Sequence, residues 1–190
     1  MTGLDEARRA LLARAAEEEL IDVAYAGVDS PVGRLLAAST REGLVTLSYP
    51  ENEPDAVLER LAAQVSPRVL EAPARLDTVR RELDEYFAGR RTAFDLPLDL
   101  RLAGDGFGRR VLEQTAAIPF GAVLTYGEVA GRAGSPRAFR AAGNALGANP
   151  IPIVVPCHRI VAAGGRLGGY TGGLERKRAL LGLERVEVGA

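Results

Sequence analysis

The chain of 190 residues contains one cysteine and one histidine, and they are neighbours in the stretch Pro156-Cys157-His158-Arg159. A free thiol has a pKa of about 8.5, and only its thiolate is an effective nucleophile. An adjacent imidazole that is oriented by an acid can hold the thiol proton and lower that pKa. The acids in the same half of the chain include Glu128, Glu175 and Glu184. Nucleophilic chemistry at Cys157 is therefore one interpretation of this stretch.

Other interpretations of the thiol stay open at this point. A cysteine beside a short apolar run can be an inert core residue. A thiol hydrolase would also use Cys157 and His158, but the chain has no second histidine elsewhere. Redox sensing is disfavoured because there is no resolving cysteine. A disulfide cannot form within the chain, and no metal site is expected, since one cysteine and one histidine cannot make the usual zinc ligand sets.

Charge is distributed unevenly along the chain, although its net charge is only −1. Residues 1–100 carry 19 acidic and 12 basic side chains, whereas residues 101–190 carry 6 acidic and 12 basic ones. The net charges of the two parts are thus −7 and +6. A basic surface binds polyanions by releasing their counterions. The second half therefore favours a nucleic-acid partner, the alternative being two ordinary faces of opposite charge.

The hydropathy pattern predicts a globular protein of the cytoplasm. No apolar run approaches the roughly 20 residues that cross a bilayer. The first 20 residues are rich in Ala, Arg and Glu and have no apolar signal core. We therefore expect no membrane association.

The first half of the chain has the pattern of a small sheet with helices, and no residue cluster in it suggests chemistry. Runs of Val, Leu and Ala separated by turn residues predict strands at 23–25, 35–38 and 44–49. Apolar residues at helical spacing predict helices over 54–65 and 76–87. Residues 4–20 are expected to form a short exposed helix or frayed extension. Residues 94–106 have the composition of a linker.

The second half has the pattern of several short helices ahead of the cysteine. The first is expected over 107–117, and Thr125 can cap a second over 126–132 that ends at Gly134. Ser135 as N-cap and Pro136 at the first helical position predict a third helix, running to about Leu146. Two short helices joined by a glycine-containing turn form a helix-turn-helix or an ordinary helical hairpin. A short apolar strand, 153–155, is expected directly before Cys157.

The third of these helices has mostly small side chains on its expected exposed face, namely Ala138, Ala141, Ala142, Gly143 and Ala145. Small side chains let a helix backbone come close to another surface. Arg137 and Arg140 on the same helix are long and cationic. Arg140 is therefore a candidate for close contact with nucleic acid, the alternative being an arginine that contacts only solvent.

Five stretches of the second half together resemble the O6-alkylguanine-DNA alkyltransferases, the methylated-DNA-protein-cysteine methyltransferases. Pro156-Cys157-His158-Arg159 is similar to their active-site signature. The supporting stretches, in the same order and spacing, are TYGEVA at 125–130, SPRAFRA at 135–141, NP at 149–150 and GYTGGL at 169–174. The match is strong over 106–186. It is loose over 21–99, through SPVG at 30–33 and ELDEYF at 82–87.

The resemblance implies roles for the residues around the thiol. Cys157 would accept the alkyl group, and His158, polarised by Glu184 and acting through a water, would help to generate the thiolate. Asn149 would brace the turn before the active-site strand. Tyr126, at the mouth of the pocket, would push the phosphate and donate a proton to the departing guanine.

Further positions are implied to contact the guanine or the DNA. Arg140 would be the finger that replaces the flipped base in the stack. Tyr170 and the backbone at Thr171 would line the pocket and hydrogen-bond the guanine. Other substrate or DNA contacts are expected at Ser135, Arg137, Ala138, Ala141, Val155 and Arg159.

The resemblance also implies the fold and the partners. The fold would be of the α/β (α+β) class, with an extension over 1–20 and a ribonuclease-H-like domain of a sheet and helices over 21–99. A mostly helical, winged-helix-like domain with a helix-turn-helix would follow over 100–190 and enter the minor groove. A monomer, nucleoid-associated when bound, would transfer alkyl groups irreversibly from O6-alkylguanine and O4-alkylthymine in duplex DNA, without metal or cofactor. Cooperative binding of several copies is left open.

Two departures from the family pattern and one alternative accompany the resemblance. Many members have a basic residue two positions before the hinge Asn149, where this chain has Gly147. The cysteine and histidine residues that bind structural zinc in some relatives are missing from the first half, so zinc is not carried over. Alkyltransferase-like proteins bind alkylated DNA and flag it without repairing it. They lack the acceptor cysteine, which disfavours that alternative here.

Overall fold

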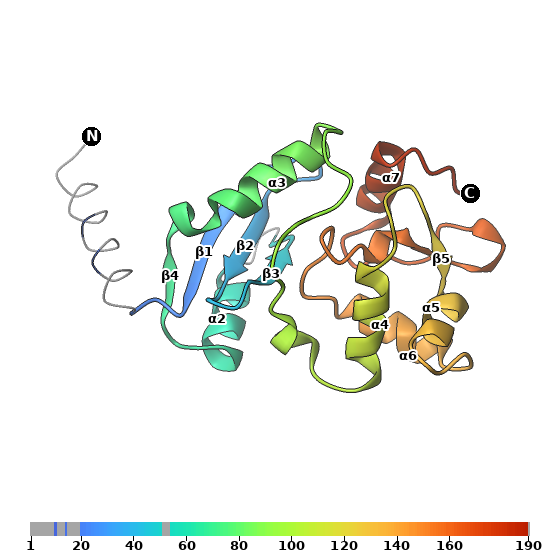
Figure 1. The fold of residues 1–190 in the computed structure, drawn as a ribbon, viewed down its shortest axis with the longest axis horizontal. Coiled ribbons are helices and arrows are strands. Elements are labelled where there is room, and N and C mark those ends of the chain that lie inside the picture. The colour runs from blue at the N-terminus through green and yellow to red at the C-terminus, as the bar shows by residue number, and fades with distance from the viewer. Residues whose placement is uncertain (1–9, 11–13, 15–19, 51–53, 190) are drawn as a thin grey trace.

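The computed structural model describes residues 10, 14, 20–50 and 54–189 (Figure 1). The extension expected over 4–20 therefore lies almost entirely outside the described residues. The first half contains a four-stranded sheet of order β3-β2-β1-β4, made of β1 (Val23–Val28), β2 (Leu35–Ser39), β3 (Leu44–Ser48) and β4 (Val69–Glu71). Strand β2 pairs antiparallel with β1 and β3, and β4 pairs parallel with β1. The three expected strands are confirmed. Strand β4, with three residues, is too short to show an alternating pattern.

The two faces of the sheet pack against different elements, because successive strand side chains point to opposite sides. Helix α2 (Pro54–Gln64) covers one face, where Leu61 packs with Val23, Ala38 and Val45. Helix α3 (Asp77–Phe87), preceded by a 3-10 turn at Pro73–Leu76, covers the other face through Val79, Leu83 and Tyr86. Both expected helices are confirmed to within a residue or two.

The segment 94–106 is more than a linker, since it pairs with the sheet. Leu98 forms a parallel bridge to Leu44, whose amide donates to the carbonyl of Pro97 at 2.8 Å. Asp99 is buried and accepts a 2.7 Å hydrogen bond from the hydroxyl of Thr40. A short 3-10 helix, Leu100–Ala103, follows. The composition of this segment is that of a linker, but its backbone is paired with strand β3.

The second half consists of short helices around a two-stranded parallel ladder. Its elements are α4 (Phe107–Ala116), β5 (Leu124–Thr125), α5 (Tyr126–Arg132), α6 (Phe139–Gly147), β6 (Ile160–Val161) and α7 (Leu174–Leu183), with 3-10 turns at Cys157–Arg159 and Ala163–Gly165. Helices α4, α5 and α6 pack on one another. Thr125 caps α5 as expected: it accepts from the amide of Glu128, whose carboxylate in turn accepts from the Thr125 amide at 2.7 Å.

Helix α6 begins three residues later than predicted, which corrects the capping role given to Ser135. Residues 135–138 form a turn in which the Ala138 amide donates to the Ser135 carbonyl at 2.9 Å. The N-cap is Ala138, with no side-chain hydrogen bond. The expected small face is also partly wrong, because Ala142 is fully buried. It packs into the helical core, while Ala141 is exposed.

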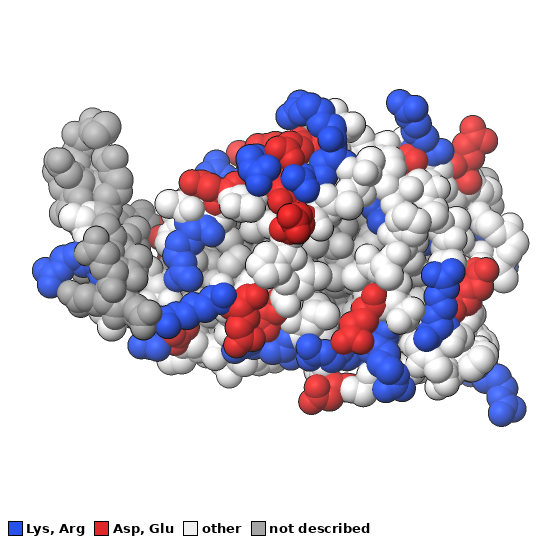
Figure 2. All heavy atoms as spheres, in the orientation of Figure 1, with Lys and Arg blue, Asp and Glu red and all other residues white. Residues whose placement is uncertain are grey.

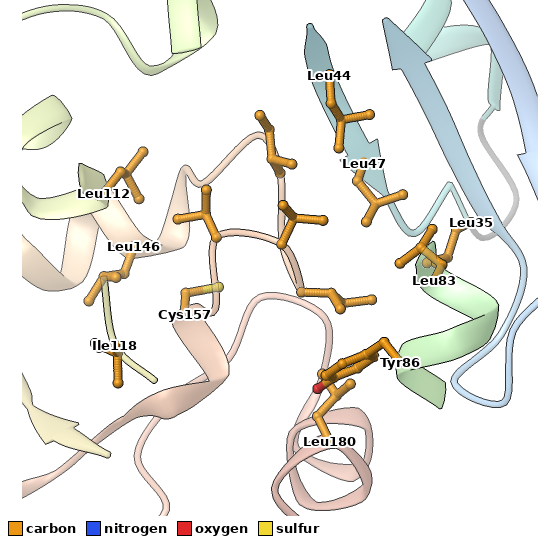
Figure 3. Packing of buried hydrophobic residues seen from close by; sticks show 14 of the residues in the cluster. Leu35, Leu44, Leu47, Leu83, Tyr86, Leu112, Ile118, Leu146, Cys157 and Leu180 are labelled. Carbon is orange, nitrogen blue, oxygen red and sulfur yellow. The ribbon is translucent and has the colours of Figure 1, made fainter. Parts of the chain in front are cut away.

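One apolar core joins the two halves of the described chain. Figure 3 shows Leu35, Leu44, Leu47 and Leu83 of the first half on one side and Leu112, Leu146 and Cys157 of the second half on the other, all in the same cluster. Strand β3 also holds the chain ahead of Cys157, since the Leu47 amide and the Thr46 hydroxyl each donate to the Pro150 carbonyl at 2.9 Å. The sheet thereby fixes the loop that carries the thiol.

Two surface properties bear on possible partners. None of the helices that the structure describes is long and apolar enough to cross a membrane. On the face shown in Figure 2, basic and acidic side chains are interspersed over both halves, so the charge difference between them forms no sharp boundary there.

Candidate active site

Cys157 is presented by a tight, proline-rich turn, and the strand expected over 153–155 is wrong. Residues 151–155 turn back so that the Val155 amide donates to the Ile151 carbonyl at 2.8 Å, and Ile153 has a φ of 74°. Cys157 then begins a 3-10 turn with His158 and Arg159. Prolines at 150, 152 and 156 lack the amide hydrogen that a strand ladder needs. Apolar burial was predicted correctly, but the backbone conformation was not.

Asn149 holds this turn together and contacts the thiol. Its side-chain oxygen accepts from the Ile151 amide at 3.0 Å, and its side-chain nitrogen donates to the Val155 carbonyl at 2.7 Å. The same nitrogen lies 3.2 Å from Sγ of Cys157. The side chain therefore fixes both ends of the turn and places a donor on the sulfur.

Behind the thiol lies a buried cluster centred on Glu184. Its Oε1 lies 2.9 Å from Nε2 of His158 and accepts from the guanidinium of Arg159 at 2.8 Å and from the hydroxyl of Tyr86 at 2.7 Å. All four side chains are buried, Arg159 being 5% exposed and His158 fully covered. The contact expected between His158 and Glu184 is thus present, and Glu128 and Glu175 are not the partners.

The electrostatics of this cluster fix which nitrogen of His158 can accept a proton. Burial would raise the pKa of Glu184, but hydrogen bonds from His158 and Arg159 outweigh it and lower that pKa to about 2. The carboxylate is therefore ionised and can only accept, so the Nε2 of a neutral His158 carries the hydrogen. Burial lowers the pKa of His158, which keeps the ring neutral. Its Nδ1 has no hydrogen-bond partner among the described residues and retains a free lone pair.

Burial also acts on the thiol. It raises the pKa of Cys157 to about 11, against the opposing hydrogen bond from Asn149. The resting sulfur is therefore a thiol at neutral pH, and its nucleophilic form needs a proton acceptor.

The His158–Glu184 pair predicts that stability falls on acidification. His158 has a folded pKa below its ordinary 6.5, so the unfolded chain takes up its proton first and stability falls as pH drops below about 6.5. Glu184 contributes stability that is present above its ordinary 4.5 and lost as pH falls towards about 2. Urea unfolding followed by circular dichroism between about pH 8 and about pH 3 measures this change in stability. A free energy of unfolding that stays constant from pH 7 to 4 contradicts the prediction.

Two cavities meet at the sulfur. One of about 280 Å³ is lined by Tyr126, Gly143, Leu146, Gly147, Cys157, Gly169, Tyr170 and Thr171. The other, of about 480 Å³, shares Cys157, Tyr170 and Thr171 with the first and extends to Tyr49, Arg60 and Gln64 of the first half. Cys157 is 7% exposed, and its thiol is reached from the surface through these cavities, whose walls are polar and aromatic.

Aromatic and backbone contacts fix the walls of these cavities. The hydroxyl of Tyr126 donates to the Gly169 carbonyl at 3.3 Å, and the hydroxyl of Thr171 donates to that of Gly147 at 3.0 Å. The hydroxyls of Tyr170 and Tyr49 lie 3.1 Å apart. Tyr126, Tyr170 and Thr171 thus line the cavities at Cys157, as expected from the sequence, and their roles towards a substrate stay predictions.

The residues expected to contact DNA fall into two groups. On the turn before α6 and on its first turn, Arg137, Arg140 and Ala141 are exposed, and Ser135 and Ala138 are partly so. Arg159 and Val155 differ. The guanidinium of Arg159 is enclosed by Glu184 and donates to the Ile118 carbonyl, and Val155 is fully buried, so neither side chain is available to a surface partner. The substrate or DNA contacts expected of these two residues stay predictions, to which their side chains offer no exposed surface.

Three residues of the site were not predicted from the sequence: Tyr49, Tyr86 and Lys177. Tyr49 and Tyr86 belong to the first half of the chain, which was expected to contain no chemistry. They could not be predicted because their contacts with the second half are long-range and leave no local sequence pattern. Tyr86 occurred in the loose ELDEYF match, which was the one available signal. Lys177, the only lysine of the chain, is fully buried, and its Nζ donates to the Ile160 and Gly169 carbonyls at 2.6 and 3.0 Å.

Comparisons with known proteins agree with this geometry. Residues 106–186 match the family model described as 6-O-methylguanine DNA methyltransferase, DNA binding domain. Residues 23–100 match the model described as 6-O-methylguanine DNA methyltransferase, ribonuclease-like domain. A methylated-DNA--protein-cysteine methyltransferase from Mycolicibacterium paratuberculosis is 44% identical over 86% of this chain and 93% of its own length.

Solved structures lead to the same family. The crystal structure of Mycobacterium tuberculosis O6-methylguanine methyltransferase is 41% identical and superposes with a TM-score of 0.75, covering 86% of this chain and 93% of that one. The crystal structure of Mycobacterium tuberculosis OGT in complex with DNA is 42% identical, with a TM-score of 0.73 over 85% of this chain and 92% of that one. The mixed α/β fold, with a sheet half followed by a helical half, is thereby confirmed. The chain belongs to the 6-O-methylguanine DNA methyltransferase family.

Proposed function

We propose that this protein repairs duplex DNA by moving the alkyl group of O6-alkylguanine, and of O4-alkylthymine, onto its own Cys157. The observation that carries the proposal is the placement of the one thiol of the chain. It lies at the junction of two cavities, beside an amide donor from Asn149 and ahead of the His158–Glu184 pair. The relatives named methylated-DNA--protein-cysteine methyltransferase support the same reaction.

The transfer is a displacement at the alkyl carbon. The thiolate of Cys157 forms the S–C bond, the C–O6 bond breaks, and the electron pair stays on the guanine, which takes up a proton. The thiol proton leaves to Nδ1 of His158 through a bridging water, since Nε2 is committed to Glu184. The thioether product has no low-energy return path, so each molecule acts once and needs no cofactor or metal.

The walls of the smaller cavity would position the guanine. Tyr126 would donate the proton to the departing base, and Tyr170 and the backbone at Thr171 would hydrogen-bond its edge. Asn149 would keep the sulfur aligned behind the carbon, because it already binds Sγ and both ends of the turn. Alignment of this kind supplies much of the rate of a reaction between bound groups.

Access to the base requires that it leave the helical stack. Enzymes that act on a base in duplex DNA extrude it into a pocket at a cost of a few kcal/mol. Helix α6 would enter the minor groove with its small side chains, and Arg140 would fill the vacated position. Ser135, Arg137, Ala138 and Ala141 would contact the backbone around it. One monomer would act per lesion, in the cytoplasm and at the nucleoid.

Mass spectrometry of the protein after mixing with a duplex that carries O6-methylguanine tests this function. The expected result is one added methyl group, on Cys157, and no turnover beyond one equivalent of DNA. The matched control is the same duplex with unmodified guanine. Intact DNA binding with an unmodified Cys157 would instead establish the non-catalytic, lesion-flagging alternative.

Arg140→Ala is expected to slow repair of a methylated duplex much more than reaction with free O6-benzylguanine. The free base does not have to be extruded from a helical stack, so its reaction does not need Arg140. In duplex DNA, the extruded base leaves a gap in the stack, and without Arg140 no side chain fills it. Single-turnover rates with both substrates measure the difference. Arg178→Ala, which removes an exposed arginine from α7, is the control. Equal slowing with both substrates would remove the finger role.

A further inference from the structure

Phe139, the first residue of α6, is the most exposed large hydrophobic side chain among the described residues. It is 50% exposed, ahead of Leu20, Leu174 and Leu70. It is also the one aromatic residue in this group. The expected small-residue face of α6 therefore carries a large ring at its start.

Phe139 lies on the same side of α6 as the mouth of the pocket. Residues four apart share a helix face, so Phe139 and Gly143 lie on the same side of α6. A Cβ atom added at Gly143 would lie 3.7 Å from the ring of Tyr126, which lines the cavity with Cys157. Phe139 thus lies one helical turn from the entrance that a flipped base would use.

The ring also contacts the predicted finger. The guanidinium carbon of Arg140 lies 5.7 Å from the centroid of the Phe139 ring, within the range of a cation–π contact. Arg132 and Arg137 are exposed on the adjoining helix end and turn. An exposed ring in contact with one arginine, with two further exposed arginines in the neighbouring segments, matches a polyanion that also offers flat apolar surfaces. That is the chemistry of stacked nucleobases.

We propose that Phe139 is a second stacking residue, which packs against the base next to the vacated position when Arg140 enters the DNA. Apolar side chains act as wedges in the minor groove, where they unstack base steps. In the free protein the ring holds the guanidinium beside it. On DNA the guanidinium enters the stack and the face of the ring becomes available to the neighbouring base. This inference rests on the proposed alkyl transfer from duplex DNA.

Single-turnover methyl transfer by Phe139→Ala tests the inference. Base–aromatic stacking predicts a slowing of about ten- to a hundredfold on the methylated duplex, with an unchanged rate on free O6-benzylguanine. Phe139→Trp should retain the duplex rate. The control is Leu70→Ala, which truncates an exposed apolar side chain on β4, in the other half of the chain. A wild-type duplex rate for Phe139→Ala, or equal slowing on both substrates, overturns the proposal.

A double variant separates stacking by Phe139 from a role exerted only through Arg140. If the ring stacks on DNA itself, Phe139→Ala combined with Arg140→Ala is slower than Arg140→Ala alone. A double variant no slower than Arg140→Ala means that the ring only holds the finger, and overturns the proposal. Failure of the proposed function is distinct from both, because the wild-type protein would then take neither the methyl group from the duplex nor the benzyl group from free O6-benzylguanine.

Discussion

A Cys157→Ser variant is expected to lose all alkyl transfer while it still binds DNA. Serine is nearly the same size as cysteine, so the turn held by Asn149 should persist. Its hydroxyl loses a proton far less readily than a thiol and is a harder, weaker nucleophile, so the nearby imidazole cannot compensate. Transfer of a labelled methyl group from duplex DNA, and a gel-shift titration with the same duplex, measure the two properties.

The binding measurement is what makes this variant informative. Loss of both transfer and binding would indicate a folding defect, and circular dichroism of the variant checks for one. Any labelled serine adduct at the wild-type rate would contradict the assignment of the sulfur as acceptor.

Glu184→Ala is expected to destabilise the protein by about 3–5 kcal/mol, because removing one partner of a buried ion pair leaves the other charge uncompensated. Arg159 would remain buried without its carboxylate, and Tyr86 and His158 would each lose a hydrogen bond. Urea unfolding at about pH 7 measures the change in the free energy of unfolding.

Glu187→Ala, at an exposed glutamate three residues further on, is the matched control and should leave stability nearly unchanged. Glu184→Gln keeps the size of the side chain and part of its hydrogen bonding. The loss of stability that it causes should therefore be smaller than the loss caused by Glu184→Ala. A Glu184→Ala protein as stable as the control would contradict the central place given to this carboxylate.

Local features of the sequence predicted most of the fold. Thr125 and Glu128 specify the start of α5 through neighbouring atoms, and the strands β1 to β3 follow from short-range alternation. The thiol and the imidazole could be singled out because they are neighbours in the sequence, whereas Asn149 was expected from the family resemblance. The contact of His158 with Glu184 could be inferred only from the family resemblance, since 26 residues separate them.

Features that depend on long-range contacts could not be predicted. The turn at 151–155 has the composition of a buried strand, and its shape follows from Asn149 and from the bonds that β3 makes to the Pro150 carbonyl. Tyr86 reaches Glu184 across 98 residues. The burial of Arg159 likewise depends on a partner that lies far away in the chain.

The buried position of Lys177 has a practical consequence for handling the protein. Burial lowers the pKa of its amine to about 8, so the uncharged, reactive form is far more populated near neutral pH than it is for an ordinary lysine. The surrounding chain nevertheless shields it from reagents in solution. Since the chain has no other lysine side chain, the rate at which a reagent acylates Nζ of Lys177 itself, measured by peptide mass spectrometry, would report how often the region around β6 and α7 opens.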